Sequence, residues 1–288
     1  MGYQNKMGKL VICPTPLGNL GDVTKRTIEA LSSCDVVCCE DTRVTGKLLS
    51  ALGIEKRLER LDEAMLSHGA KQVIDRICSG EVIAYCSDAG MPGVSDPGQR
   101  LIDCAYNQGA PVEVLPGGTA VATAYVASGF TSQNFYFGSF FPRKEGERTT
   151  LLNSLKTLNC VLVFYESPNR IVSALNFIAE SYPFRRVAVC RELTKLHEEV
   201  VRGLSGEVAE QFTKRQNSGG IKGEIVLVID APSQDELEND SQDALNGAHH
   251  RCDELKQLGT YSNKEIMKLL QKEFSISRNE AYALVHGA

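Results

Sequence analysis

Short apolar runs alternate with helix-like segments along most of the chain, and this alternation limits the possible folds more than any other feature. Each run is brief, rich in valine and isoleucine, and bounded by polar, glycine or proline residues, as strands are. The predicted strands are Lys9–Cys13, Val36–Cys39, Val82–Cys86, Pro111–Leu115, Phe135–Ser139, Val161–Tyr165, Arg186–Arg191 and Glu224–Ile229. Strands and helices in alternation predict an α/β protein with mostly parallel sheets.

The predicted helices begin at capping residues or prolines, and several end at glycine. Asp22 is expected to cap a helix that places Ile28 and Leu31 on one face. Asp96 and Pro97 are expected to open another, which ends at Gly109. The remaining predicted helices are Arg43–Leu52 with Gly53 as its stop, Gly146–Leu158, Asn169–Ser181 and Ser205–Lys214.

The composition changes after the last predicted strand. The segment Pro232–Asn246 is rich in acidic residues and poor in apolar ones, which predicts an acidic linker. Beyond it, Ser262 and Glu265 have the spacing of a capping box, and Ser277 precedes a second helical run, Arg278–Val285. Two short helices joined by a turn are typical of a small helix-turn-helix-like module, which either binds nucleic acid or packs on the main body.

A chain of 288 residues is long enough for two domains and a small third piece. We therefore expect an N-terminal α/β domain (residues 1–118), a second α/β domain (119–231), the acidic linker (232–247) and a helical C-terminal domain (248–288).

The cysteines and the charge indicate the surroundings in which the chain works. The ten cysteines show no C-x-x-C pair and lie mostly in apolar runs, which predicts buried thiols in a reducing compartment. A net charge of -5 argues against a uniformly basic, indiscriminate nucleic-acid binder, but a local basic cleft is compatible with it. The sequence has no 18-residue apolar stretch, and Met1–Gly8 lacks the apolar part of a signal peptide. We expect a cytoplasmic protein with no membrane contact and no metal.

Glycine- and proline-rich loops follow four of the predicted strands, and ligands of α/β proteins bind at such loops. Asp88 follows its strand directly, so its carboxylate is expected to point into a cleft and to accept hydrogen bonds from a ligand ammonium or ribose. Glu166 and Arg170 suit an active site, and a structural ion pair explains the same spacing. The loops are Pro14–Asp22, Ser87–Gly98, Leu115–Ala120 and Tyr165–Arg170, and the first lacks both the G-x-G-x-x-G and the P-loop pattern.

Basic residues near these loops suit contact with phosphate. Arg43 and Lys47 share one face of a predicted helix. The run Phe140–Arg148 combines aromatic with basic residues, a mixture that suits base stacking and phosphate contact, and an ordinary solvated loop is an equal alternative. His197 stands alone in a charged turn, and we interpret it as solvated.

Taken in this order, the segments resemble the tetrapyrrole-methylase superfamily, and within it the branch that methylates the ribose 2′-hydroxyl of a decoding-centre cytidine in 16S ribosomal RNA. The resemblance implies two α/β domains with S-adenosylmethionine in a cleft between them, a homodimer, and 16S rRNA within the small ribosomal subunit as the partner. It also covers the helical C-terminal module. The segments that carry it are Pro14–Asp22, Cys39–Leu49, Ser87–Gly98, Pro116–Ala120, Phe137–Lys144, Glu166–Ile171, Arg191–Gly203 and Gly223–Val228.

The resemblance and the loop positions together suggest three groups of site residues. The expected cofactor-binding residues are Leu17, Asp88, Gly90, Met91, Ser95, Thr119, Ala120, Tyr165, Leu193, Gly223 and Glu224. The expected catalytic residues are Glu166 and Asp41 as carboxylates, with Arg170 and Lys195 as cations that hold phosphate or stabilise a developing alkoxide. The expected RNA-binding residues are Arg43, Lys47, Arg143 and Lys144.

Two departures from the family pattern keep other functions open. The third loop reads Pro-Gly-Gly-Thr-Ala in place of Pro-Gly-Pro-Ser-Ala, and Thr119 keeps the hydroxyl. Asn169 replaces a usual histidine and cannot titrate, so a mechanism that needs a base there would be lost. One alternative is a methylase for a small, porphyrin-type molecule, and another is a ribosome assembly factor without catalysis. The Phe140–Arg148 run and the helical module favour RNA over a porphyrin.

Overall fold

The computed structural model describes residues 8–274 and 276–287, so the expectation about a signal peptide in Met1–Gly8 lies, except for Gly8, outside the described residues. The described chain forms two compact units. The first unit comprises the residues up to Pro142 together with Val161–Asp230, and it holds both β-sheets. The second comprises Arg143–Cys160 and the residues from Ala231 onward.

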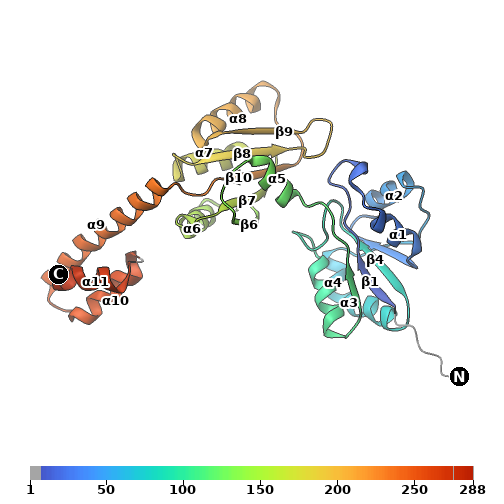
Figure 1. The fold of residues 1–288 in the computed structure, drawn as a ribbon, viewed down its shortest axis with the longest axis horizontal. Helices are drawn as coiled ribbons and strands as arrows, with labels where there is room; N and C mark the ends of the chain where they lie inside the picture. Colours follow the sequence, from blue (N-terminus) through green and yellow to red (C-terminus); the bar gives the residue numbers. More distant parts are fainter. Residues whose placement is uncertain (1–7, 275, 288) are drawn as a thin grey trace. The chain divides into compact units, whose positions relative to one another are not determined.

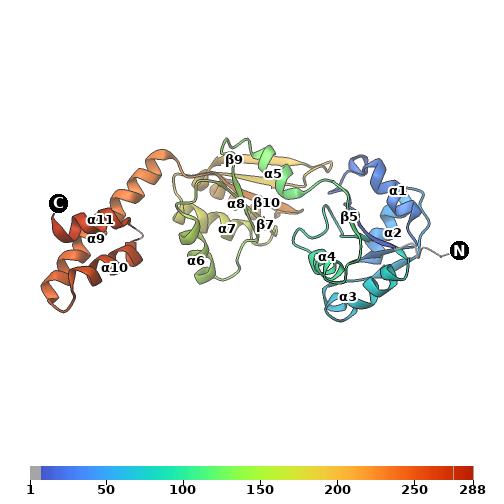
Figure 2. The same ribbon diagram turned by 60° about the horizontal axis from the view of Figure 1, so that its bottom comes forward.

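The first sheet is wholly parallel, as predicted. Its strands are β1 (Lys9–Ile12), β2 (Val36–Cys39), β3 (Leu58–Arg60), β4 (Val82–Cys86) and β5 (Val112–Val114), in the order β3-β2-β4-β1-β5. Helices α1 (Lys25–Ser33) and α2 (Thr42–Ala51) cover one face, and α3 (Glu63–Cys78) and α4 (Gly98–Asn107) lie side by side on the other (Figures 1 and 2). Because successive strand residues point to opposite faces, Val37 and Cys39 pack with α1 and α2, and Val36 and Cys38 pack with α3 and α4.

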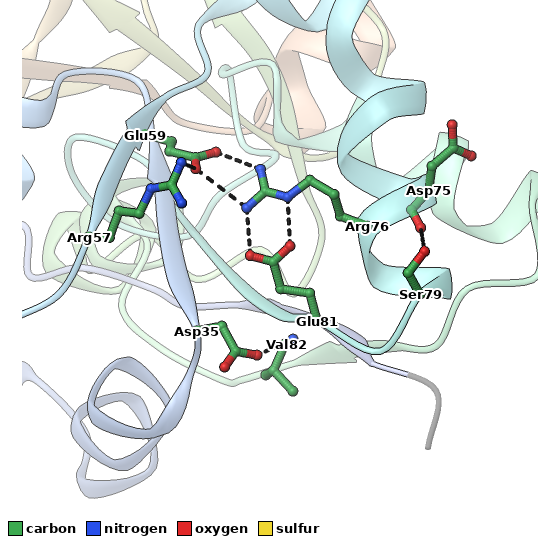
Figure 3. Close-up of polar contacts among 8 residues, drawn as sticks. All are labelled: Asp35, Arg57, Glu59, Asp75, Arg76, Ser79, Glu81 and Val82. Carbon is green, nitrogen blue, oxygen red and sulfur yellow. Dashed lines mark hydrogen bonds and ion pairs between the residues drawn. The ribbon is translucent and has the colours of Figure 1, made fainter. Parts of the chain in front are cut away.

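The edge strand β3 lies outside the predicted strands because it is short and mostly polar. An ion-pair cluster links it to its neighbours (Figure 3). Arg76 of α3 donates to Glu59 of β3 and, through two nitrogens, to Glu81 before β4, each at 2.6 Å. Arg57 adds a second cation 2.9 Å from Glu59. These contacts connect α3, β3 and the start of β4, a connection that the apolar pattern of the sequence does not indicate.

The second sheet is mostly antiparallel, so the prediction of mostly parallel sheets is wrong for it. Only β6 and β7 run parallel; β10 is antiparallel to both of its neighbours, and β8 returns directly into β9 as a hairpin. Its strands are β6 (Phe135–Phe140), β7 (Val161–Glu166), β8 (Arg186–Arg191), β9 (Glu199–Leu204) and β10 (Ile225–Ile229), in the order β6-β7-β10-β8-β9. Helix α5 (Ala120–Ser128) packs on Val163, Cys190 and Val226, and α7 (Ile171–Ser181) lies beside α8 (Ser205–Gly219).

Two predicted helix starts are shifted by local hydrogen bonding. Asp22 lies in the 3₁₀ turn η1 (Leu20–Asp22), and Thr24 caps α1 instead, its hydroxyl oxygen accepting a backbone N–H of the first turn at 3.1 Å. Pro97 precedes α4 rather than opening it, while Asp96 accepts backbone N–H groups on both sides of the turn. Leu31 is buried as predicted.

The second unit is helical. It holds α6 (Glu145–Leu155), α9 (Gln234–Leu258), α10 (Asn263–Phe274) and α11 (Arg278–His286). The expected linker 232–247 is not irregular, because α9 runs through most of it. Ser233 caps this helix, and the acidic residues of its first turn interact favourably with the positive end of the helix dipole. In its C-terminal half, Cys252 and Leu255 pack against α10 and α11. The capping box of Ser262 and Glu265 is confirmed.

The cysteines follow the prediction of buried thiols. All ten are free, and eight are buried; Cys78 and Cys104 are half-buried. Burial raises the pKa of Cys38 and of Cys190 to about 12. These thiols therefore stay protonated and serve as packing groups.

Candidate active site

A cavity of about 420 Å³ lies in the first unit, at loops that follow β2, β4, β5 and β7 and at the start of β10. Its volume falls within the roughly 300–1,000 Å³ usual for small-molecule sites. All eleven residues expected to bind the cofactor line it: Leu17, Asp88, Gly90, Met91, Ser95, Thr119, Ala120, Tyr165, Leu193, Gly223 and Glu224. The structure thus brings together residues that lie as far apart as 17 and 224 in the sequence.

The first two glycine-rich loops are joined to each other by backbone hydrogen bonds. The Thr15 N–H donates to the Gly90 carbonyl at 2.9 Å, and the Gly90 N–H donates to the Thr15 carbonyl at 3.1 Å. Gly90 has a φ of 82°, and a Cβ there would lie 3.0 Å from the Leu17 side chain. Only glycine meets both requirements without strain. This pairing fixes one wall of the cavity.

The third loop presents a helix N-terminus to the cavity. Thr119 caps α5 as expected, its hydroxyl oxygen accepting from the Ala122 N–H at 3.3 Å. Both Thr119 and Ala120 line the cavity. Backbone N–H groups at a helix start suit ligand oxygens.

The charged residues that line the cavity are all acidic. Its lining contains Glu40, Asp88, Asp96, Glu166 and Glu224, and it contains no lysine, arginine or histidine. Burial raises the pKa of Glu40 and of Asp88 above their ordinary values. Glu166 and Glu224 are paired with Arg170 and Lys195, so it is the remaining acids, Glu40, Asp88 and Asp96, that favour a ligand carrying positive charge.

The connection between β8 and β9 closes another side of the cavity through Leu193. Two of its residues hold left-handed backbone conformations, Glu192 with a φ of 54° and Thr194 with a φ of 66°. Non-glycine residues with such angles cluster at functional sites. Lys195, an expected catalytic residue, does not line the cavity, because its Nζ is paired with Glu192 at 2.9 Å and with Glu224 at 2.8 Å.

Glu166 and Arg170 form a bidentate ion pair at the end of β7. Arg170 Nε lies 2.7 Å from Glu166 Oε1, and Arg170 Nη2 lies 2.8 Å from Oε2. The Glu166 side chain has no solvent exposure, and its Oε1 also accepts from the Ser167 N–H at 2.6 Å. Glu166 lines the cavity and Arg170 does not. Of the two explanations left open for this pair, the geometry favours the structural one.

Asp41, the second expected catalytic carboxylate, also lies outside the lining of the cavity. It caps α2 and accepts from the Arg43 side chain at 2.6 Å. These hydrogen bonds hold the pKa of Asp41 well below its usual range. A carboxylate held in its ionised form in this way is a weak proton acceptor.

The residues expected to bind RNA are all exposed. Arg43 and Lys47 lie four residues apart on α2, and the Arg43 side chain is 86% exposed. In the second unit, Arg143 precedes α6, and Lys144 caps it and pairs with Glu147 at 3.2 Å. Asn169 is exposed and does not line the cavity, so the departure at this position leaves the cavity walls unchanged.

Several lining residues are absent from the predicted site. Glu40 is the most consequential, because it lines the cavity directly after β2, as Asp88 does two residues after β4. The same rule that selected Asp88, a polar residue directly after a strand, would have found it. Cys190 and Val226 give no such signal, since they read as ordinary strand residues. Within residues 8–274 and 276–287, no cluster of side chains suits a metal ion, and no helix could cross a membrane.

Comparison with known proteins agrees with the fold. The family model of tetrapyrrole (corrin/porphyrin) methylases matches residues 9–209. Diphthine synthase superimposes with a TM-score of 0.63 at 13% identity, over 81% of this chain and 94% of its own. Uroporphyrin-III C-methyltransferase from Thermus thermophilus, complexed with S-adenosylhomocysteine, gives 0.54 at 16% identity over 77% and 97%.

Two curated relatives are much closer in sequence, and both are named ribosomal RNA small subunit methyltransferase I. The protein from Bacillus subtilis is 35% identical and matches over 99% of this chain and 97% of its own length. The protein from Thermotoga maritima is 41% identical over 77% of this chain and 98% of its own length. The second relative therefore lacks a counterpart to about a quarter of this chain.

Proposed function

Because the chain belongs to the tetrapyrrole (corrin/porphyrin) methylase family, we propose that it transfers a methyl group from S-adenosylmethionine to 16S rRNA of the small ribosomal subunit. The acceptor that we assign is the ribose 2′-hydroxyl of a cytidine in the decoding region. The observation that carries the rRNA substrate is the match to the B. subtilis relative along nearly the whole chain. The uroporphyrin-III and cobalt precorrin-4 methyltransferases, at 16% and 17% identity, support the fold only.

The cavity fits the proposed cofactor in size and charge. When bound, S-adenosylmethionine supplies an electrophilic methyl group on a sulfonium, and it also carries an ammonium group. Asp88 offers a carboxylate to these positive groups, and the start of α5 offers N–H donors to oxygens. Gly223, with a φ of 97°, lets the backbone approach a ligand without a Cβ. The residues of this chain therefore bind, orient and shield the cofactor.

We assign the RNA contacts to the exposed cations. Arg43 and Lys47 hold phosphates beside the cavity, since α2 begins two residues after Glu40. Arg143 and Lys144 are assigned to the same partner. Lys195 is already paired with two carboxylates, so we propose that it stabilises the loop that carries Leu193.

We further propose that two copies of the chain associate, with α5 in the interface. This helix is apolar on all sides, and Val126 is 74% exposed. Next to it, Phe135 of the edge strand β6 is 44% exposed, and its ring lies 4.9 Å from that of Tyr125. A helix that is apolar all round is expected to be covered. Light scattering after gel filtration should give twice the chain mass, and Val126→Asp should give the monomer mass.

We propose that the reaction takes place in the cytoplasm, where ribosomal subunits are. The test of the proposed function is methyl transfer to small ribosomal subunits isolated from cells that lack this protein. Tritiated S-adenosylmethionine supplies the label, and the RNA is then digested with alkali. An alkali-resistant labelled dinucleotide places the methyl group on a ribose 2′-oxygen. Cofactor binding without incorporation would point to another acceptor, or to an assembly factor without catalysis.

A further inference from the structure

The proposed reaction releases a proton. Of the carboxylates in and beside the cavity lining, Asp88 is assigned to the cofactor, Asp96 accepts backbone N–H groups and Glu224 is paired with Lys195, which leaves three candidates to accept the proton. Two of them are occupied. Both oxygens of Glu166 accept from Arg170, and both oxygens of Asp41 accept from Arg43. A carboxylate paired with a guanidinium loses much of its basicity. The third is Glu40.

Glu40 occupies a different position. It follows β2 directly and lines the cavity. Its Oε1 accepts from the Asp88 N–H at 3.2 Å, and within the described residues its Oε2 has no hydrogen bond. Asp88 in turn accepts from the Asp41 N–H at 3.2 Å. These two hydrogen bonds join the loop after β2 to the loop after β4. They hold Glu40 in place and leave its Oε2 available to accept a proton.

Among the residues that the structure describes, no lysine, arginine or histidine forms an ion pair with Glu40, and the main electrostatic influences on it come from acids. The titratable groups that act on it are Asp88 and Asp96 of the loop after β4 and Asp62 before α3. Burial, the largest influence, and these three acids raise the pKa of Glu40. Tyr85 of β4 lies close enough for Glu40 to raise the pKa of its buried phenol, which stays protonated. A carboxylate in such a place takes up a proton more readily than one in water.

The position of Glu40 also suits the acceptor. Arg43 and Lys47 lie on the helix that begins immediately after it. If these residues hold the phosphates of the RNA strand, the ribose between them enters the cavity at its Glu40 end. The ribose and the cofactor then meet inside a cavity lined by acids and apolar groups.

We propose that Glu40 is the catalytic residue that accepts the proton of the ribose 2′-hydroxyl during methyl transfer. This inference rests on the proposed function. The O–H bond breaks, and the proton passes to Glu40 Oε2. The hydroxyl oxygen forms a bond to the methyl carbon, whose bond to sulfur breaks with its electron pair remaining on sulfur. Glu40 then releases the proton to water and returns to its ionised form.

The experiment compares Glu40→Gln and Glu40→Asp with the full-length wild type and with Glu29→Gln, an exposed carboxylate on α1 that lies outside the cavity lining. Single-turnover rates on small subunits are measured from pH 5 to 9, and cofactor affinity is measured by calorimetry. We expect Glu40→Gln to lower the rate about 100- to 10,000-fold with a cofactor Kd within about threefold of wild type. The fall in rate at low pH should disappear in this variant, Glu40→Asp should retain part of the rate, and Glu29→Gln should match wild type.

Three results would overturn the proposal: a Glu40→Gln rate close to that of wild type, a loss of cofactor affinity as large as the loss of rate, or the same acid limb in both proteins. If Glu40→Gln fails to fold, Glu40→Asp decides, since a merely structural role predicts no change in its pH profile. Failure of the proposed function itself gives a separate result, because the wild type would then bind cofactor and label no ribose.

Discussion

Replacing Arg170 by methionine should destabilise the first unit strongly. The Glu166 carboxylate has no solvent exposure and accepts two hydrogen bonds from Arg170, at 2.7 and 2.8 Å. Arg170 also donates to the Phe141 carbonyl. Removing one partner of a buried pair leaves an uncompensated charge and costs about 3–5 kcal/mol. At roughly 2–4 °C per kcal/mol, the unfolding temperature should fall by about 10 °C.

The assay is calorimetric unfolding of five proteins in the same buffer. Besides Arg170→Met, these are wild type, Glu166→Gln, the double variant with both changes, and Lys214→Met. Lys214 forms the same kind of pair with Glu210, four residues apart, but at side-chain exposures of 73% and 69%. Its loss should cost at most about 0.5 kcal/mol. The double variant should recover part of the loss, because a neutral amide is easier to bury than an unpaired carboxylate.

The reasoning would be refuted if Arg170→Met unfolded within 2 °C of wild type, or if the double variant lost as much as its two single changes combined. The same proteins test the expected catalytic role of Glu166. If the pair is structural, Glu166→Gln should keep its methyl-transfer rate within about tenfold whenever it is folded, well short of the loss on removing a catalytic base.

Three other substitutions probe different parts of the molecule. Gly138→Ala would place a Cβ 2.2 Å from the ring of Phe164, so it should cost about 1–3 kcal/mol in urea unfolding; an unchanged midpoint would contradict this. Glu40→Gln should raise the unfolding temperature of the ligand-free protein at pH 8 and not at pH 4. Because the pKa of Glu40 is raised in the folded state, ionising this carboxylate as the pH rises lowers the free energy of unfolding of the wild type, and glutamine avoids that loss. A lower unfolding temperature for Glu40→Gln than for wild type at pH 8 would contradict this. Gly18→Ala would meet the Lys195 side chain at 2.2 Å, so cofactor affinity should fall severalfold in calorimetry, and unaltered affinity would show that this contact is unimportant.

The sequence predicts those parts of the fold whose signals are local. β2, β4 and β8 have the bounds that their apolar runs predict. The strands β3 and β9 escape prediction because they are short or half polar, and α9 escapes because its buried apolar residues lie in its second half. The direction of β10 depends on its partners β7 and β8, which no local pattern reveals.

The candidate site shows the same difference between features with a local sequence signal and features that depend on three-dimensional contacts. The eleven expected cofactor residues line one cavity because their loops follow strands, and the family pattern points to those loops. The expected catalytic residues fare differently, since residue type cannot show which carboxylate is paired. Asp41 and Glu40 are neighbours in the chain, yet Arg43 occupies the first and leaves the second available. That difference appears only in three dimensions.

The buried thiols make the chain its own reporter of unfolding. Only Cys78 and Cys104 are partly accessible among its ten cysteines, so a colourless disulfide reagent that releases a dye should react with no more than these two in the native protein. The other eight become reactive only as their sheets or helices open. Cys252 reports on the helical unit, and Cys190 on the second sheet. In variants that keep only Cys252 or only Cys190, with the other cysteines replaced by serine, the rate of dye release would follow the opening of each part separately, without an added label.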